Sequence, residues 1–125
     1  NDIGAGCKRT IVMMLHQKQR FPEKVDFVTT PGYFGGGKER ETYGFFGNGP
    51  SAVISTLGIL RFDPDTREMY LESYHPGVTV QQVRENTGWE LKISPTVRET
   101  ERPDPELIRI LREDLDPTGV FLGKK

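Results

Sequence analysis

Apolar residues along this chain gather in short runs separated by polar and glycine-rich stretches. Residues 10–15 are β-branched or apolar throughout, which is typical of a strand buried on both faces. Residues 25–30 begin with alternating apolar and polar positions and predict a second strand, which stops at Pro31-Gly32. The polar stretch between the two runs is short for a helical crossover, so we expect an irregular connection or a long hairpin there.

The clearest strand signal lies in the middle of the chain. Residues 52–62 predict one long strand, in which Gly58 marks a bulge or a close backbone approach. Residues 68–75 alternate again and predict a partner strand. The stretch 63–67, Asp-Pro-Asp-Thr-Arg, is rich in turn-forming residues, so the two strands are expected to form a β-hairpin.

A short helix is predicted over residues 80–87. Thr79 and Gln82 have the spacing of a capping box, and Gly88 is expected to end the helix in a left-handed conformation. A short strand at 89–93 follows, with alternate residues on one face. Those residues are Trp89, Leu91 and Ile93.

The last predicted element is a helix that begins after Asp104. Asp104 is a good N-cap, Pro105 suits the first helical position, and Asp116-Pro117 ends the helix. Its apolar stripe consists of Leu107, Ile108, Leu111 and Leu115. Together these elements predict an α/β fold with an open, mostly buried sheet flanked by helices.

Composition and charge narrow the class of protein. At 125 residues the chain is about one domain, and its apolar content argues against disorder. The 17 Lys and Arg residues nearly balance the 18 Asp and Glu residues, which argues against a basic nucleic-acid binder and a polybasic membrane surface. We expect no membrane span or signal peptide, and the lack of an initiator Met indicates a processed or truncated product. A single cysteine fits a reducing, cytoplasmic location.

Residues 31–50 stand out as a long stretch of unusual composition. They hold seven of the 14 glycines and five of the 12 aromatic residues. A loop of this length is usually functional or mobile, and its aromatic residues are expected to pack on something. The chain therefore predicts a long, glycine- and aromatic-rich loop here.

The residues do not by themselves define a reaction. His16 and His75 lie far apart in sequence and no zinc-binding spacing is present, so both are interpreted as surface or rim histidines and no metal is expected. Cys7 lacks a nearby basic partner in sequence, and no G-x-S-x-G elbow occurs.

One stretch of the loop has a composition that suits an anionic ligand. Gly35, Gly36 and Gly37 would let backbone amides approach a phosphate or carboxylate, and two cations follow. Those cations are Lys38 and Arg40. The stretch matches neither a Walker loop nor a dinucleotide fingerprint, and a flexible surface loop is the alternative.

An ordered set of strings resembles a known family. In order and spacing they are similar to the C-terminal half of the β subunit of family I CoA-transferases, of the glutaconate CoA-transferase type, over essentially the whole chain. The strings are IVMMLHQKQRF, VDFVTTPG, GGGKERE, LGILRFD, MYLESYHPGV, ENTGW and PDPELIRILREDLDP.

The resemblance implies an activity and a missing half. Family I enzymes move CoA between two carboxylic acids through a glutamyl-CoA thioester, with coenzyme A as a substrate and no permanently bound cofactor. The nucleophilic glutamate lies in an E-S-G or E-N-G context in the N-terminal half, so we expect no catalytic residue in this chain. Residues 1–125 are then the C-terminal portion of one domain whose N-terminal portion is absent.

The same resemblance implies ligands and partners. Asn1 and Asp2 look like the last two residues of a glycine-rich ligand loop, and they join residues 35–38 and Arg40 as expected ligand-binding residues. The expected partners are the α subunit, acyl-CoA and a carboxylic acid, with no nucleic acid and no membrane. Two alternatives remain: a subunit of a ring-opening CoA-thioester hydrolase of the same fold, and a non-catalytic scaffold half that binds the α subunit.

Overall fold

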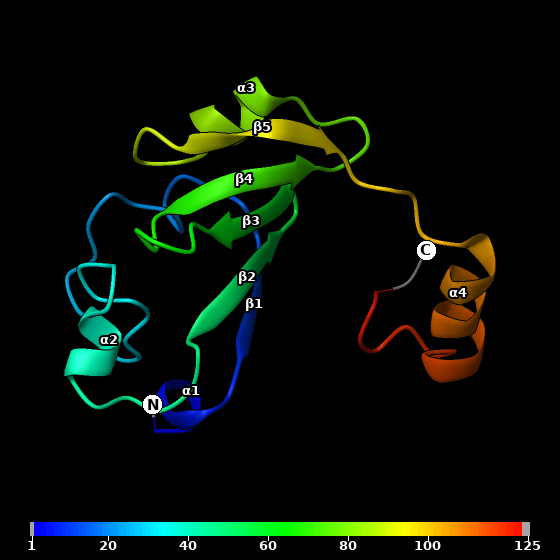
Figure 1. The fold of residues 1–125 in the computed structure, drawn as a ribbon. Helices are drawn as coiled ribbons and strands as arrows, with labels where there is room; N and C mark the ends of the chain where they lie inside the picture. Colours follow the sequence, from blue (N-terminus) through cyan, green and yellow to red (C-terminus); the bar gives the residue numbers. More distant parts are fainter. Residues whose placement is uncertain (1, 124–125) are drawn as a thin grey trace.

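Five strands form one sheet in sequence order. The structure, a computed structural model, describes residues 2–123 and the side chains of residues 3–123. The sheet order is β1-β2-β3-β4-β5 (Figure 1). Their bounds are β1 Thr10–Met14, β2 Pro50–Ser55, β3 Gly58–Phe62, β4 Met69–Tyr74 and β5 Lys92–Glu99.

The sheet is mixed. β2, β3 and β4 form an antiparallel meander, and the edge strands β1 and β5 pair in parallel with β2 and β4. Each parallel pair needs a connection that returns the chain to the same end of the sheet. The first connection, residues 15–49, carries the glycine-rich stretch, and the second, residues 75–91, carries a helix.

The predicted hairpin is confirmed, but the long strand at 52–62 is wrong. The chain reverses after Ser55, because the Ser55 hydroxyl accepts hydrogen bonds from the amides of Leu57 and Gly58 and so closes a tight turn. The close backbone approach expected at Gly58 is confirmed, since an added Cβ would clash with the backbone oxygen of Ser73. A single strand pattern thus conceals two strands.

The strand predicted at 25–30 is also wrong. These residues, all within the described chain, form an irregular segment. The side chains of Val25, Phe27 and Val28 are 58%, 79% and 61% exposed. An alternating pattern needs a neighbouring strand to pair with, and the edge position beside β2 is already occupied by β1.

The expectation of a mostly buried sheet is wrong as well. β1, predicted to be buried on both faces, is an edge strand whose Ile11 and Met13 are 49% and 77% exposed. One face of the sheet carries the core, beneath α3 Val80–Glu85 and residue Phe21. The buried residues of that core are Phe21, Val53, Leu60, Leu71, Val83 and Leu91.

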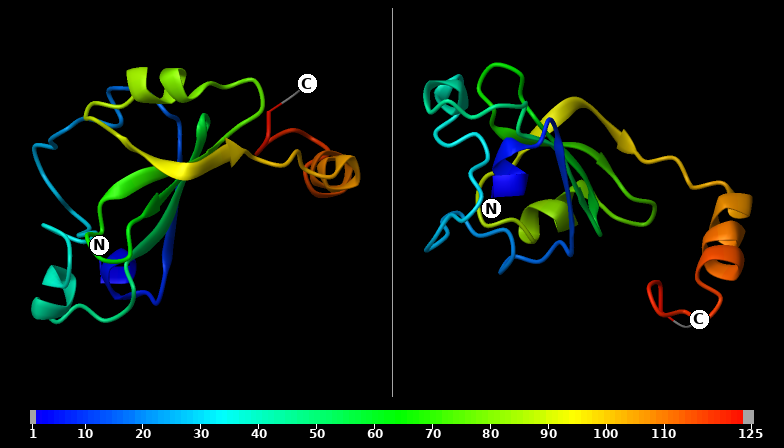
Figure 2. Two further views of the ribbon diagram at one scale, coloured as in Figure 1. Left: turned by 45° about the horizontal axis from the view of Figure 1, so that its top comes forward. Right: turned by 90° about the horizontal axis from the view of Figure 1, so that it is seen from below.

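The opposite face of the sheet is left largely open. Side chains alternate along a strand, so Ile11, Met13, Ile59 and Arg61 face away from the core. Arg61 pairs with Glu72 on this face at 3.1 Å, and both side chains are partly exposed. Helices are few, and none lies over this face in the views of Figure 2.

The capping signals of the second connection are confirmed. The Thr79 hydroxyl accepts from the Gln82 amide, and the Gln82 side chain accepts from the Thr79 amide. Gly88, however, is not left-handed. Its amide donates to the Phe21 carbonyl at 2.7 Å, and its missing side chain leaves room for the backbone of residues 21–23. The strand after it starts at Lys92 rather than at Trp89.

The predicted C-terminal helix lies away from the sheet. Asp104 caps α4 Pro105–Arg109 as expected, and the helix continues as a π-helix, η1 Ile110–Leu115. An extended segment joins it to β5 (Figure 1). Its stripe residues Leu107, Leu111 and Leu115 are 57%, 43% and 68% exposed. We call residues 105–122 the C-terminal arm. Among the described helices, none is long and apolar enough to span a membrane.

Candidate functional site

The glycine-rich stretch 31–50 is folded around a short helix. Helix α2, Glu39–Thr42, lies beside the sheet in Figure 1, where sequence reasoning predicts only a loop. Its aromatic residues do pack, as expected. The Tyr33 ring meets the Phe62 ring of β3 edge-on, with centroids 5.2 Å apart, and Phe34 contacts Tyr43 and Phe45.

The amides of the glycine triplet are already engaged. The Gly35 amide donates to the Glu39 carboxylate, the Gly36 amide to the Tyr33 carbonyl, and the Gly37 amide to the Thr66 carbonyl. Gly36 and Gly37 have φ values of 102° and 52°, which glycine adopts without strain. The triplet therefore docks the stretch onto the β3–β4 turn, and a ligand would have to displace these bonds to reach the amides.

Arg40 is buried at the centre of the stretch. The residue is only 4% exposed, and its five side-chain N–H groups all have carbonyl acceptors. Those acceptors are the backbone oxygens of Ala5, Pro31, Gly32, Phe46 and Gly47. Arg40 therefore holds together three segments of the chain and has no donor left for direct ligand contact. Lys38, the N-cap residue of α2, is exposed.

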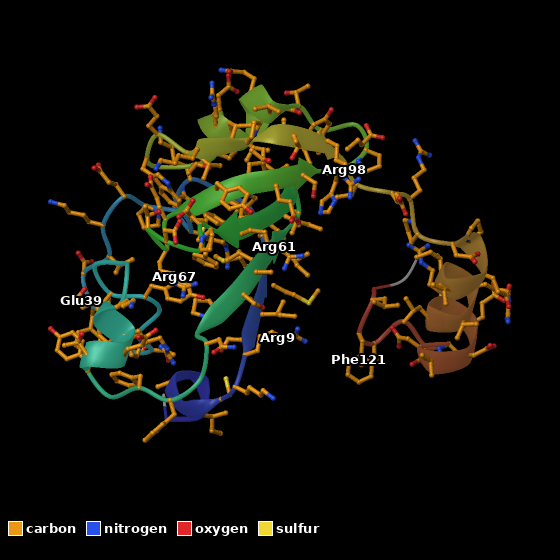
Figure 3. All side chains as sticks on the ribbon, viewed as in Figure 1. Arg9, Glu39, Arg61, Arg67, Arg98 and Phe121 are labelled. Atoms are coloured by element: carbon orange, nitrogen blue, oxygen red, sulfur yellow. The ribbon has the colours of Figure 1, made fainter. Side chains whose placement is uncertain are left out.

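A cleft of about 430 Å³ opens between this stretch, the start of β2 and the β3–β4 turn. Its charged lining residues are Arg9, Arg40, Glu41 and Arg67. Gly37 reaches the same cleft, whereas Lys38 does not line it. Figure 3 shows Arg67 between the sheet and the segment that carries Glu39.

Sequence reasoning misses Arg9 and Arg67. Arg9 precedes β1, and Arg67 lies in the β3–β4 turn with a φ of 63°, a conformation rare outside glycine. The Arg67 guanidinium lies over the Tyr33 ring, 5.1 Å from its centroid. No local pattern connects these two residues, because the cleft forms only when the sheet and the stretch 31–50 come together.

A second cavity, of about 480 Å³, adjoins the cleft on the core side of the sheet. Its lining is mostly apolar and includes Val12, Val53 and Met69. Four residues line both cavities, namely Tyr33, Pro50, Phe62 and Arg67. A charged cleft and an apolar pocket therefore meet at Tyr33 and Arg67.

The interpretation of His16 as a rim residue is wrong. It is buried, and its ring stacks on the Phe21 ring with centroids 4.1 Å apart. Its Nδ1 lies 2.8 Å from Ser55 Oγ, and its Nε2 lies 3.1 Å from Thr87 Oγ1. Burial lowers the pKa of His16, so the neutral form is favoured.

The His16–Ser55 pair is structural. Ser55 is itself buried, and its hydroxyl already accepts two backbone amides of the turn that follows β2. A nucleophile must reach its substrate, and this hydroxyl cannot do so without opening the turn. His75, half-buried, bonds Thr100 and the Ser55 carbonyl, so it ties β5 to the same turn.

The remaining expected ligand residues lie at the start of the chain. Asn1 lies outside the described residues, as does the side chain of Asp2, whose backbone begins the helix α1 Asp2–Gly6. Within the part of the chain described, no group of three or more His, Cys, Asp and Glu side chains is placed to hold a metal ion.

The chain belongs to the coenzyme A transferase family, because the model of that family matches residues 1–86. Among curated proteins it is 46% identical to the β subunit of glutaconate CoA-transferase from Acidaminococcus fermentans, over 94% of this chain and 44% of the relative. It is 38% identical to the β subunit of 3-oxoadipate CoA-transferase from Pseudomonas knackmussii, over 86% of this chain and 42% of the relative.

Solved structures agree on the fold. Glutaconate coenzyme A-transferase from Acidaminococcus fermentans matches with a TM-score of 0.91 and 41% identity, over 100% of this chain and 48% of that chain. Rhodococcus jostii IpdAB matches with a TM-score of 0.71 and 31% identity, over 90% of this chain and 45% of that chain. The chain thus spans somewhat less than half the length of the relatives it matches.

Proposed function

We propose that this chain forms the C-terminal portion of the β-subunit domain of a heteromeric CoA-transferase, which moves CoA between an acyl-CoA and a free carboxylic or dicarboxylic acid. The observation that carries the proposal is the likeness to the glutaconate CoA-transferase β subunit, which extends over 94% of the chain at 46% identity. A fold match over the full chain supports it.

The proposed reaction uses a glutamate that lies outside these residues. That carboxylate attacks the thioester carbonyl of the donor, the thiolate of CoA leaves, and a mixed anhydride remains; the thiolate then attacks the glutamyl carbonyl and releases the donor acid. The acceptor acid reverses both steps. Covalent catalysis of this kind replaces one difficult exchange by several easier ones. The residues of this chain would then bind and orient the substrates.

A direct test compares the chain alone with the assembled enzyme. The purified 125-residue chain, mixed with glutaryl-CoA and acetate, is expected to show no exchange above a blank, because the nucleophile is missing. The same chain within the complete subunit, together with its partner subunit, is expected to form acetyl-CoA. Exchange by the isolated chain, or none by the assembled heteromer with any acid pair tried, would contradict the proposal.

A hydrolase of the same fold is a second candidate. The chain is 34% identical to the IpdB subunit of a cholesterol ring-cleaving hydrolase from Rhodococcus jostii, over 84% of its own length. The two activities differ in their products. Release of free CoA from a cyclic CoA thioester, with no transfer to added acetate, would favour the hydrolase.

Partner binding is proposed for the surfaces that this chain leaves open. The uncovered sheet face carries Ile11 and Met13, and the C-terminal arm carries Leu107 and Leu111, all of them substantially exposed. Apolar surface of this extent is typical of an interface. We assign these surfaces to the N-terminal portion of the subunit and to the α subunit. In the scaffold alternative these contacts are the only role of the chain.

The ligand role predicted for residues 35–38 is tested through Lys38. Lys38→Ala changes an exposed side chain, whereas an Arg40 variant would disturb the packing of the whole stretch. If Lys38 binds substrate, the variant raises KM for acyl-CoA or acid in the assembled enzyme, and Lys24→Ala, also exposed, leaves it unchanged. Equal KM values for both variants would remove Lys38 from the site.

A further inference from the structure

The cleft beside the glycine-rich stretch gathers three arginines from segments far apart in sequence. Arg9 comes from the residue before β1, Arg40 from α2, and Arg67 from the β3–β4 turn. The one carboxylate in the lining belongs to Glu41, so the lining carries a net of two positive charges from three guanidinium groups and one carboxylate.

These arginines differ from others in how their charge is balanced. Arg61 pairs with Glu72, and Arg109 pairs with Glu106. Across residues 3–123, no ion pair includes Arg9, Arg40 or Arg67. Arg40 is also buried, and a buried charge is normally compensated by an opposite one. The cleft therefore presents a positive potential to any ligand that enters it.

The three guanidinium groups have different roles. Arg40 contributes charge only, because carbonyl oxygens already accept from all its N–H groups. Arg67 is held in place by the Tyr33 ring beneath it, which leaves its N–H groups free to donate. Arg9 is exposed at the edge of the cleft. Two arginines with free planar faces suit the bidentate recognition of phosphate oxygens.

The neighbouring cavity narrows the class of ligand. The arginine-lined cleft meets the apolar pocket at Tyr33 and Arg67. A molecule that spans both needs a multiply charged anionic end and a less polar body.

We propose that Arg9 and Arg67 bind phosphate groups in this cleft, with Arg40 as a buried supporting charge, and that the phosphates are those of the CoA substrate. The assignment to CoA rests on the proposed function. The phosphate site itself rests only on the arginines and the cleft.

The first test measures phosphate binding to the 125-residue chain without any chemistry. Inorganic pyrophosphate is titrated into the wild type and into Arg9→Gln, Arg67→Gln and Arg98→Gln by calorimetry at low ionic strength. Arg98 is the matched control, because it is an exposed arginine that lines a different cleft beside Glu72 and Glu99. Loss of one charge-assisted contact at Arg9 or Arg67 is expected to weaken binding about 10-fold, and the control is expected to match the wild type. Arg67→Lys, which keeps the charge but not the fork, is expected to fall between the two. Circular dichroism confirms that each variant is folded.

A second test identifies the source of the phosphate. CoA is expected to displace pyrophosphate, and the same two substitutions are expected to weaken CoA binding, whereas pantetheine, which lacks phosphate, is expected to bind equally to all variants. If CoA binds but ignores both substitutions, the assignment to CoA is overturned. If pyrophosphate does not bind, or if the Arg98 variant weakens binding as much as the others, the site is overturned. The same holds if the substitutions impair only assembly of the complete subunit, since the arginines then pair with carboxylates of the rest of the protein. Pyrophosphate binding that depends on Arg9 and Arg67, in an assembled protein without acyl-CoA exchange, would refute the proposed function and leave the phosphate site standing.

Discussion

His16 Nδ1 and Ser55 Oγ, in residues 39 positions apart, lie 2.8 Å from each other inside the protein. The Thr87 hydroxyl donates to the Val83 carbonyl, so it accepts the proton that His16 carries on Nε2. Nδ1 then accepts from Ser55. This neutral tautomer joins the end of β1, the turn after β2 and the end of α3, and protonation would remove the acceptor.

The burial of His16 predicts a pH-dependent stability. Because burial lowers its pKa, the unfolded chain binds more protons than the folded chain once the pH falls below about 6.5. The free energy of unfolding is therefore expected to decrease as the pH falls from 7 to 5, by at most about 1.4 kcal/mol per pH unit. Urea unfolding of the wild type and of His16→Gln measures this. The variant is expected to lose the decrease, and an equal decrease in both proteins would contradict the prediction.

Arg40 is expected to be the most sensitive charged residue for stability. Arg40→Lys keeps the charge, but an ammonium has three donors for the five carbonyls now bound. The loss of these bonds to a charged donor is expected to cost about 2–4 kcal/mol of unfolding free energy. Denaturant unfolding compares it with Arg98→Lys on the exposed strand β5, where a change within about 0.5 kcal/mol is expected. A similar small change at Arg40 would show that the carbonyls are satisfied in another way.

Gly58 tests how tightly the turn after β2 packs on β4. An added Cβ at this position would overlap the Ser73 backbone oxygen and lie 3.1 Å from the Tyr74 Cα, and neither backbone atom can move without disturbing the sheet. Gly58→Ala is expected to destabilise the chain by about 1–3 kcal/mol in thermal or urea unfolding. Gly6→Ala is the matched control, since nothing lies within 4 Å of its added Cβ. The prediction fails if both variants unfold alike.

The C-terminal arm is expected to contribute to assembly and little to the stability of the chain itself. Leu107→Asp with Leu111→Asp changes two side chains that are mainly exposed, so the unfolding free energy of the isolated chain is expected to change by less than about 1 kcal/mol. Association of the complete subunit with its partner, measured by sedimentation, is expected to weaken. Leu60→Ala, in the core, is expected to show the reverse pattern and to cost about 2–5 kcal/mol. Normal assembly of the double variant would remove the arm from the interface.

Features set by neighbouring residues are the ones that the sequence predicts well. Thr79 with Gln82 and Asp104 with Pro105 cap their helices as expected, because each cap joins atoms only a few residues apart. The ordered strings likewise identify the family, since they need no knowledge of contacts. The β3–β4 hairpin follows from a turn of five residues between two alternating runs.

Features that depend on distant contacts are the ones that the sequence misses. The alternation at 25–30 cannot show that the place beside β2 belongs to β1. Nothing near Arg9 in the sequence points to Arg67, and nothing near Arg40 points to the Ala5 carbonyl that it binds. The exposure of β1 is hidden for the same reason, because burial depends on what covers a strand.

The parallel pairing of β1 with β2 also bears on how the chain reaches this fold. Paired residues such as Val12 and Val53 are separated by the whole connection 15–49, so the entropy of closing that loop must be lost before the pair forms. The β2–β3–β4 meander, by contrast, uses two short turns. We expect the meander to form first and β1 to join it late, carrying with it the Arg40 cluster and the cleft. Amide hydrogen exchange would then show β1 as the first strand to open, and a ligand held in the cleft would slow that opening.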